Sequence, residues 1–393
     1  MSTEAKYIIY SSVLPSVAYG MFYTDIAYFL TTVQGLSFNL MGLIVTTMGV
    51  STFITSIPMG IAADKYGRKR ILILSNVIAS IIIAIFALTT NPALLITAAV
   101  FEGVSEAAAS ASQSALLAEK SEDIMRNSTF AMFGFAQSTA FGVGGIAILA
   151  TETMHGFSNK SIHVVLYVVL AMLSLASTVI IFKVRESKSL KTNAKLSDLL
   201  PKKSKNVLVK YVLSGSIIAL GAGMVVPLMT AWMKAQYGIP DSLSGPILGV
   251  SSIVIGLSTL ASPWLAKKFG LINAIVVTEG ISTIFMFATP LSPDYIIASV
   301  VYTLRAFLMN MSSPLAQSMI MGLVPEDERG AASGISAALW RLPNALSSFI
   351  GAWLIGLGLL KTPFFIAALL YIISIALFWY FFRNIKMPED KNQ

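Results

Sequence analysis

Acidic and basic residues inside long apolar stretches are the places where this sequence could do chemistry. Glu102 and Glu106 lie four residues apart, so in a helix their side chains share one face. Two neighbouring carboxyl groups shielded from water favour a proton on at least one of them, and such a group could carry protons. The other charged residues that stand out inside apolar stretches are Asp25, Glu279, Arg305 and Arg341.

The elements that hold these residues are predicted to be membrane-spanning helices. The 393-residue chain is 55% hydrophobic and 12% charged, with a mean hydropathy of +0.76, which exceeds what a soluble core absorbs. The apolar runs lack the alternation of a β-barrel strand, so they predict an all-α membrane protein with twelve transmembrane helices. The runs cover residues 7–32, 38–63, 71–89, 93–118, 128–151, 162–182, 209–233, 243–266, 271–290, 295–323, 331–358 and 363–382.

The distribution of basic residues predicts how the chain is oriented. Most of the 27 Lys and Arg residues lie in segments on the same side of the membrane as the N-terminus. By the positive-inside rule, both termini are cytoplasmic and the protein lies in the cell membrane. This placement accounts for the net charge of +8 without a nucleic-acid partner. The first run carries Asp25 and many aromatic residues, so we expect a retained helix rather than a removable leader.

A polar, basic segment at residues 183–208 divides the chain into two similar halves. An offset of 203 residues superposes widely spaced positions of one half on the other. The matched pairs are Gly20 with Gly223, Met21 with Met224, Lys65 with Lys268, Gly67 with Gly270, Ser110 with Ser313 and Arg126 with Arg329. The predicted organisation is a six-helix bundle at 1–182, a cytoplasmic linker at 183–208 and a second six-helix bundle at 209–393.

A burst of charge between the second and third apolar runs has a defined spacing. The positive-inside rule explains the Lys and Arg residues of this loop, but it does not explain the spacing of the glycines and the aspartate. The pattern reads Gly60-x-x-x-Asp64-x-x-Gly67-Arg68-Lys69-Arg70. Together with the topology, the repeat and the linker, this pattern resembles the major facilitator superfamily over nearly the whole chain.

The resemblance implies that this loop is a latch that holds the two bundles together on the cytoplasmic side. Gly60 and Gly67 would allow close helix contact and a tight turn, and Asp64 would face the N-terminal end of the helix at 331–358. A loop arginine would pair with an acid near the end of the run 93–118, namely Glu119, Glu122 or Asp123. The predicted latch residues are Gly60, Asp64, Gly67, Arg68, Lys69, Arg70, Glu119 and Asp123.

The resemblance also implies a central cavity surrounded by the runs 7–32, 93–118, 209–233 and 295–323. Glu102 and Arg305 are related by the repeat, so they could pair across that cavity. Glu279, in a run that usually faces lipid, is expected to be structural. The candidates for proton coupling are Asp25, Glu102 and Glu106. The candidates for substrate binding are Met21, Tyr23, Asp25, Glu102, Arg305, Met309 and Arg341.

The expected function is proton-coupled secondary transport of a small organic molecule by alternating access, nearest to the drug-antiporter-like members of the superfamily. Export of amphipathic or drug-like compounds is favoured, because the cavity runs supply Met and aromatic side chains that adapt to varied apolar ligands. An organic anion or metabolite held by Arg305 and Arg341 is the alternative, and symport and antiport both stay open. A receptor, a channel or an intramembrane enzyme ranks lower. We expect a monomer with no cofactor, and no metal site, because His155 and His163 are predicted to be isolated.

Overall fold

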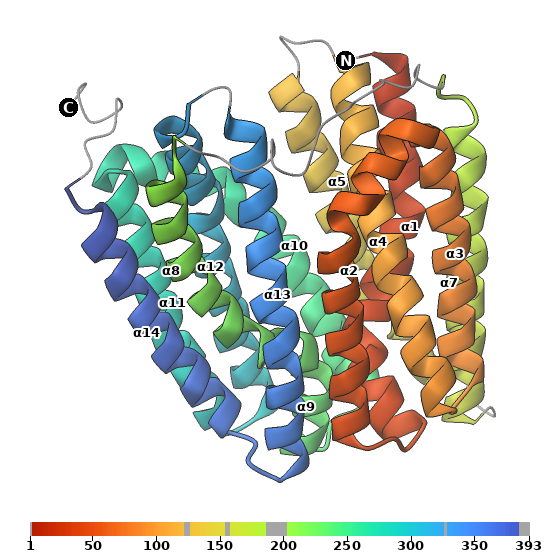
Figure 1. Ribbon diagram of the computed structural model, residues 1–393. Coiled ribbons are helices and arrows are strands. Elements are labelled where there is room, and N and C mark those ends of the chain that lie inside the picture. The colour runs from red at the N-terminus through yellow and green to blue at the C-terminus, as the bar shows by residue number, and fades with distance from the viewer. Residues whose placement is uncertain (1, 122–125, 154–157, 186–202, 326–327, 385–393) are drawn as a thin grey trace. The chain divides into compact units, whose positions relative to one another are not determined.

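The computed structural model describes residues 2–121, 126–153, 158–185, 203–325 and 328–384, and within these ranges all regular structure is helical (Figure 1). The first-half helices are α1 (Thr3–Tyr28), η1 (Phe29–Val33, a π-helical turn), α2 (Phe38–Tyr66), α3 (Arg68–Leu88), α4 (Pro92–Lys120), α5 (Arg126–Ala147), α6 (Ala150–Thr153) and α7 (Asn159–Ile181). The second-half helices are α8 (Lys205–Gly223), η4 (Val226–Leu228), α9 (Met229–Tyr237), α10 (Asp241–Phe269), α11 (Leu271–Ala288), η5 (Thr289–Leu291), α12 (Tyr295–Leu323), α13 (Arg329–Gly356) and α14 (Thr362–Phe382).

Polar residues just before the apolar runs determine where several helices begin. The side chains of Ser37, Asn91, Ser158 and Asp294 each accept a hydrogen bond from a backbone N–H in the first turn of the following helix. Those N–H groups have no carbonyl partner inside the helix, so the caps satisfy them. As a result α2, α4, α7 and α12 begin within a few residues of the predicted starts.

Ten helical segments of the described chain are long and apolar enough to cross a membrane, by length and composition. Within the same described residues this measure does not select α1 or α13, which occupy the predicted runs 7–32 and 331–358. The all-helical membrane class is therefore confirmed, while the predicted number of twelve spans is only partly supported.

The predicted run 209–233 is not one continuous helix, although its two pieces together count as one candidate span. α8 ends at Gly223, the 3-10 turn η4 follows, and α9 begins at Met229. Pro227 lies in this turn and has no backbone N–H to donate to a preceding carbonyl. The prediction of a single helix here was wrong for that reason.

The helices form two compact units, which we describe separately. Unit 1 comprises Met1–Thr192 and Pro227–Ile253, so it holds α1 to α7, α9 and the first part of α10. Unit 2 comprises Asn193–Val226 and Val254–Gln393, so it holds α8, the rest of α10 and α11 to α14. The division into bundles at 1–182 and 209–393 stays a prediction.

Four helix pairings of unit 1 recur between the corresponding helices of unit 2. In unit 1, α1 packs against α5 and α7, and α3 packs against α4 and α7. In unit 2, α8 packs against α13 and α14, and α11 packs against α12 and α14 (Figure 1). The offset of 203 residues converts the first set of pairings into the second, so the packing supports the internal repeat.

Glycines permit the closest of these helix contacts. A Cβ atom at Gly20 would lie 2.0 Å from the backbone oxygen of Phe141, so the backbones of α1 and α5 touch there. A Cβ atom at Gly223 would lie 1.9 Å from the backbone oxygen of Asn344, where α8 meets α13. The same 203-residue offset relates the two contacts. Small residues at such crossings let helices approach closely where burial of apolar surface cannot drive their association.

Gly223→Ala is expected to destabilise unit 2 by about 1–3 kcal/mol, because the added methyl group overlaps α13 and forces the helices apart. Gly215→Ala on the same helix is the matched control, since a Cβ there meets nothing within 4 Å. Alanine has the higher helix propensity, so this control should keep or slightly raise stability. Thermal unfolding of the purified variants in detergent measures the difference, and equal melting temperatures would contradict the close contact.

Candidate functional site

The first group of predicted site residues joins two carboxyl groups to one tyrosine in unit 1. Tyr23 on α1 donates to Glu102 Oε1 at 2.6 Å and lies 3.3 Å from Glu106 Oε2. Thr52 on α2 donates to the same oxygen of Glu106 at 3.1 Å. Glu102 is buried, and both glutamates face the tyrosine from α4. We call Tyr23, Thr52, Glu102 and Glu106 the carboxyl cluster.

Close helix packing holds the carboxyl cluster in place. A Cβ atom at Gly103 would lie 2.3 Å from the backbone oxygen of Met48, so α4 touches α2 beside Glu102. One turn earlier on α1, the ring of Tyr19 stacks on that of Tyr23, with centroids 5.7 Å apart. Three helices therefore fix the positions of the two acids.

A single tyrosine hydroxyl cannot fully satisfy two ionised carboxylates. It carries one hydrogen, and an ionised carboxylate can only accept hydrogen bonds. The shorter contact, to Glu102, uses that hydrogen. The longer contact, to Glu106, becomes a full hydrogen bond when a carboxyl proton is donated to the tyrosine oxygen. The carboxyl cluster is therefore suited to hold one proton between two acids.

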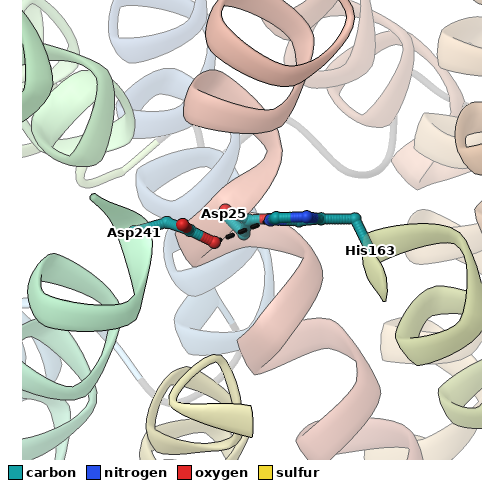
Figure 2. Close-up of side chains that lie close together, drawn as sticks. All are labelled: Asp25, His163 and Asp241. Carbon is teal, nitrogen blue, oxygen red and sulfur yellow. Dashed lines mark hydrogen bonds and ion pairs between the residues drawn. The ribbon is translucent and has the colours of Figure 1, made fainter. Parts of the chain in front are cut away.

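The second group surrounds Asp25, also in unit 1. Tyr167 on α7 donates to Asp25 Oδ2 at 3.0 Å, and His163 Nε2 lies 3.7 Å from the same oxygen. His163 Nε2 also lies 2.7 Å from Oδ2 of Asp241, which is the first residue of α10 (Figure 2). All four side chains are buried. We call Asp25, His163 and Asp241 the aspartate–histidine cluster.

The prediction that His163 is isolated was wrong, and the expectation of no metal site rested on it. One nitrogen of His163 and one oxygen each of Asp25 and Asp241 lie within 4.8 Å of one another, as metal ligands do. The ring of Phe29 stacks on the imidazole, with centroids 5.5 Å apart. Asp241 was missed because it precedes the predicted run 243–266, although an acid at a helix start is a recognisable signal. The other histidine, at position 155, lies outside the described residues.

Arg305 is buried in unit 2 between aromatic rings. Its guanidinium lies 5.8 Å from the ring centroid of Tyr302 and 5.5 Å from that of Tyr371. Its Nη2 donates to the hydroxyl of Tyr371, while its Nε has no hydrogen-bond partner in the part of the chain that is described. Glu102 belongs to unit 1, so its predicted pairing with Arg305 stays a prediction.

The remaining substrate candidates lie on three different helices. Met21 is fully buried on α1, whereas Met309 on α12 and Arg341 on α13 are partly buried. Glu279 on α11 is buried and accepts a hydrogen bond from Ser312 at 2.8 Å. This contact between α11 and α12 is of the kind that a structural residue makes.

The charged loop between α2 and α3 forms an ionic network within unit 1. Arg68 binds Asp64 Oδ1 through Nε at 2.8 Å and through Nη2 at 2.7 Å. Its Nη1 lies 3.3 Å from Glu119 Oε2, near the end of α4. Lys69 donates to the backbone oxygen of Phe182 at 3.0 Å, just after α7. The loop thereby ties α2, α3, α4 and α7 together.

The other predicted latch residues make different contributions. Gly67 joins α2 to α3 with φ 107°, a backbone conformation that favours glycine. A Cβ atom at Gly60 would meet one side-chain atom at 4.0 Å, so the close helix contact expected there does not occur within unit 1. Arg70 is exposed. Glu122 and Asp123 lie outside the described residues.

Known proteins resemble this chain over nearly its whole length. A sequence model of the Major Facilitator Superfamily matches residues 10–347 and 211–393. Multidrug resistance protein 2 of Bacillus subtilis (strain 168) is 22% identical over 357 residues, which cover 88% of this chain and 87% of that protein.

Solved structures share the fold at low sequence identity. A mutant of the nucleoside transporter NupG has a TM-score of 0.80 at 13% identity, covering 97% of this chain and 100% of that chain. A D-xylose-proton symporter has a TM-score of 0.77 at 16% identity, covering 98% of this chain and 99% of that chain. At these identities the likeness establishes the fold alone.

Proposed function

Because the chain belongs to the Major Facilitator Superfamily, we propose that it is a proton-coupled secondary transporter that exports small amphipathic or drug-like organic molecules. It is a multi-pass membrane transporter and not an enzyme, as its family and the transporters that share its fold indicate. The mechanism we propose is alternating access between two six-helix bundles, at 1–182 and 209–393, in a monomer. The excess of basic residues on one side supports cytoplasmic termini in the cell membrane.

The carboxyl cluster is the observation that carries the proposed proton coupling. When the cluster holds a proton, the hydroxyl of Tyr23 can bond both Glu102 and Glu106; without that proton, two negative charges lie side by side. Closing the site to water disfavours the doubly ionised form, and opening it to water stabilises that form. Proton uptake and release would then follow the conformational cycle. Asp25 stays a candidate carrier, but it lies in the other cluster, so the proposal rests on the two glutamates.

The proposed class of substrate is supported by a related protein of known name and by methionine side chains on two helices. The relative from Bacillus subtilis is a multidrug resistance protein that matches most of both chains. Met21 and Met309 lie on α1 and α12, which the family resemblance places beside the transport path. Thioether and aromatic side chains adapt their packing to apolar ligands of different shape. Export driven by protons would be antiport, whereas proton-driven uptake would be symport.

An organic anion is the second candidate substrate, and the surroundings of Arg305 favour it. The buried guanidinium packs on two tyrosine rings, and its Nε–H group has no acceptor among the residues that the structure describes. A substrate carboxylate or phosphate would supply two acceptor oxygens that match this fork of donors. Arg341, partly buried on α13, would add a second positive charge.

The ionic network of the charged loop supports the proposed latch. Arg68 holds the carboxylate of Asp64 by two hydrogen-bonding nitrogens and also reaches Glu119. These contacts fix the orientation of Asp64 at the end of α2. A carboxylate held in this way could meet the positive N-terminal end of α13, the helix that the resemblance assigns as its partner.

Replacing the coupling acid by its amide should separate proton coupling from substrate movement. Glu102→Gln mimics the protonated acid, so proteoliposomes with this variant should keep substrate exchange and lose the accumulation driven by a pH gradient. Substrate exchange and accumulation driven by a pH gradient are both measured with the same labelled substrate. Glu279→Gln is the matched control, because Glu279 is also buried but bonds Ser312 in unit 2. If Glu102→Gln, Glu106→Gln and the double variant all accumulate substrate normally, the carboxyl cluster is not the coupling site.

The two substrate classes predict different behaviour for Arg305→Lys. An anionic substrate would lose the two-pronged guanidinium contact, so its affinity should fall about tenfold or more. The affinity for an apolar or cationic compound should stay nearly unchanged. Thermal stabilisation of the purified protein by a panel of drugs and organic anions measures both cases. An anion that binds Arg305→Lys and Arg305→Ala as tightly as the unaltered protein would remove the anion site.

The latch predicts that Asp64→Asn shifts the protein toward inward-facing states. The amide lacks the negative charge that would face the positive N-terminal end of α13 in the closed latch, and a loss of about 1 kcal/mol changes the ratio of two states about fivefold. Distances between spin labels on the cytoplasmic ends of the two bundles report this ratio. Arg70→Gln, an exposed position in the same loop, serves as the control. An unchanged distance distribution in a variant that also transports normally would exclude the latch.

A further inference from the structure

The aspartate–histidine cluster brings three charged or ionisable side chains from three helices to one buried point. Asp25 comes from α1, His163 from α7 and Asp241 from the start of α10 (Figure 2). No more than 2% of any of the three residues is exposed. The nitrogen Nε2 of His163 is the centre of the group, at 2.7 Å from Asp241 Oδ2 and 3.7 Å from Asp25 Oδ2. None of the three belongs to the carboxyl cluster.

The hydrogen bond made by Nδ1 of His163 determines the tautomer of the neutral imidazole, and therefore whether Nε2 has a lone pair. His163 Nδ1 lies 2.8 Å from the backbone oxygen of Asn159. A carbonyl oxygen can only accept, so Nδ1 carries a hydrogen. In the neutral ring Nε2 then presents a lone pair toward two carboxylate oxygens. Three electron-rich atoms this close repel one another unless a proton or a metal ion lies among them.

A single proton leaves the charges of the cluster unbalanced. With a proton on Nε2, one imidazolium faces two carboxylates, which leaves one net negative charge in a buried place. Moreover, Asp25 Oδ1 is buried and has no hydrogen-bond partner among the described residues. A doubly charged cation bound by a neutral imidazole and two carboxylates brings the sum of charges to zero.

We propose that Asp25, His163 and Asp241 form a binding site for a divalent transition-metal ion of the Zn²⁺ class. An imidazole nitrogen combined with carboxylate oxygens is a donor set that such ions accept, and three protein ligands leave a position for water or another ligand. The surrounding contacts are those of a metal site. Asn159 holds the imidazole in the ligating tautomer, and Tyr167 donates to Asp25 at 3.0 Å, which orients its carboxylate.

A bound ion would join α1, α7 and the beginning of α10 within unit 1. Two neighbouring contacts already support this junction: Thr230 on α9 donates to the backbone oxygen of Thr24 at 2.8 Å, and Ser242 on α10 donates to Glu152 Oε1 at 2.8 Å. Metal binding should therefore stabilise the folded protein, whether or not the carboxyl cluster couples protons to transport.

The test uses the full-length protein, purified without a histidine tag and stripped of metal with a chelator. Zn²⁺ should raise its melting temperature, and the rise should grow with the logarithm of the free metal concentration. One equivalent of Co²⁺ should produce a visible absorption band of a nitrogen- and oxygen-bound ion. The chain has no cysteine, so no thiol contributes to this spectrum.

Matched variants locate the bound ion. His163→Gln and Asp241→Asn should weaken the affinity for Zn²⁺ at least tenfold, whereas His155→Gln, at the only other histidine of the chain, should leave it unchanged. Tyr167→Phe keeps all three ligands and loses only the bond that orients Asp25, so it should weaken the affinity about tenfold. If His163→Gln does not fold, Tyr167→Phe and the Co²⁺ spectrum of the unaltered protein decide the question.

Two results would overturn the site. One is an unaltered, folded protein whose melting temperature does not respond to Zn²⁺ and whose Co²⁺ sample shows no band, even if its stability changes with pH; the cluster would then hold a proton only. The other is a Zn²⁺ response of equal size in the unaltered protein, in His163→Gln and in Tyr167→Phe, because the metal would then be bound elsewhere.

Discussion

Ionisable side chains that are shut away from water must be matched by hydrogen bonds or by opposite charge, and this constraint organises unit 1. Two residues of α1 that lie within one helical turn take part in such hydrogen bonds. Tyr23 donates to Glu102 on α4, and two residues later Asp25 accepts from Tyr167 on α7. Residues two apart in a helix point to nearly opposite sides, so α1 lies between the two clusters. A rotation or shift of this helix would disturb both at once.

Close backbone contacts make such placement possible. Gly20 lies three residues before Tyr23, and a Cβ atom there would overlap the backbone of Phe141 on α5. The equivalent contact at Gly223 occurs between α8 and α13, so each unit uses the same packing with different chemistry. Where unit 1 has Glu102 bonded to a tyrosine, the corresponding residue of unit 2 is Arg305, packed on two tyrosine rings. The repeat thus conserves helix packing while the buried charge changes sign.

Local patterns predicted most of the fold, because apolar run length and capping residues act within a few residues of each helix. The pairing of Glu102 with Glu106 was equally local, since their spacing places them on one face of a helix. The break at Pro227 was missed because an apolar run masks a single proline. The group of Asp25, His163 and Asp241 was missed because its members are widely separated in sequence, and only tertiary packing brings them together. No spacing rule links three residues on three different helices.

Proton movement during transport is the property on which the proposed mechanism depends most directly. The measurement uses the unaltered protein in liposomes that enclose a pH-sensitive dye, with no imposed gradient and a substrate identified by thermal stabilisation. Substrate addition should move protons in the opposite direction, and a gradient of one pH unit should sustain about tenfold accumulation for each proton exchanged. A proton ionophore should abolish that accumulation. Saturable substrate movement with no change in internal pH, and unaffected by the ionophore, would contradict proton coupling.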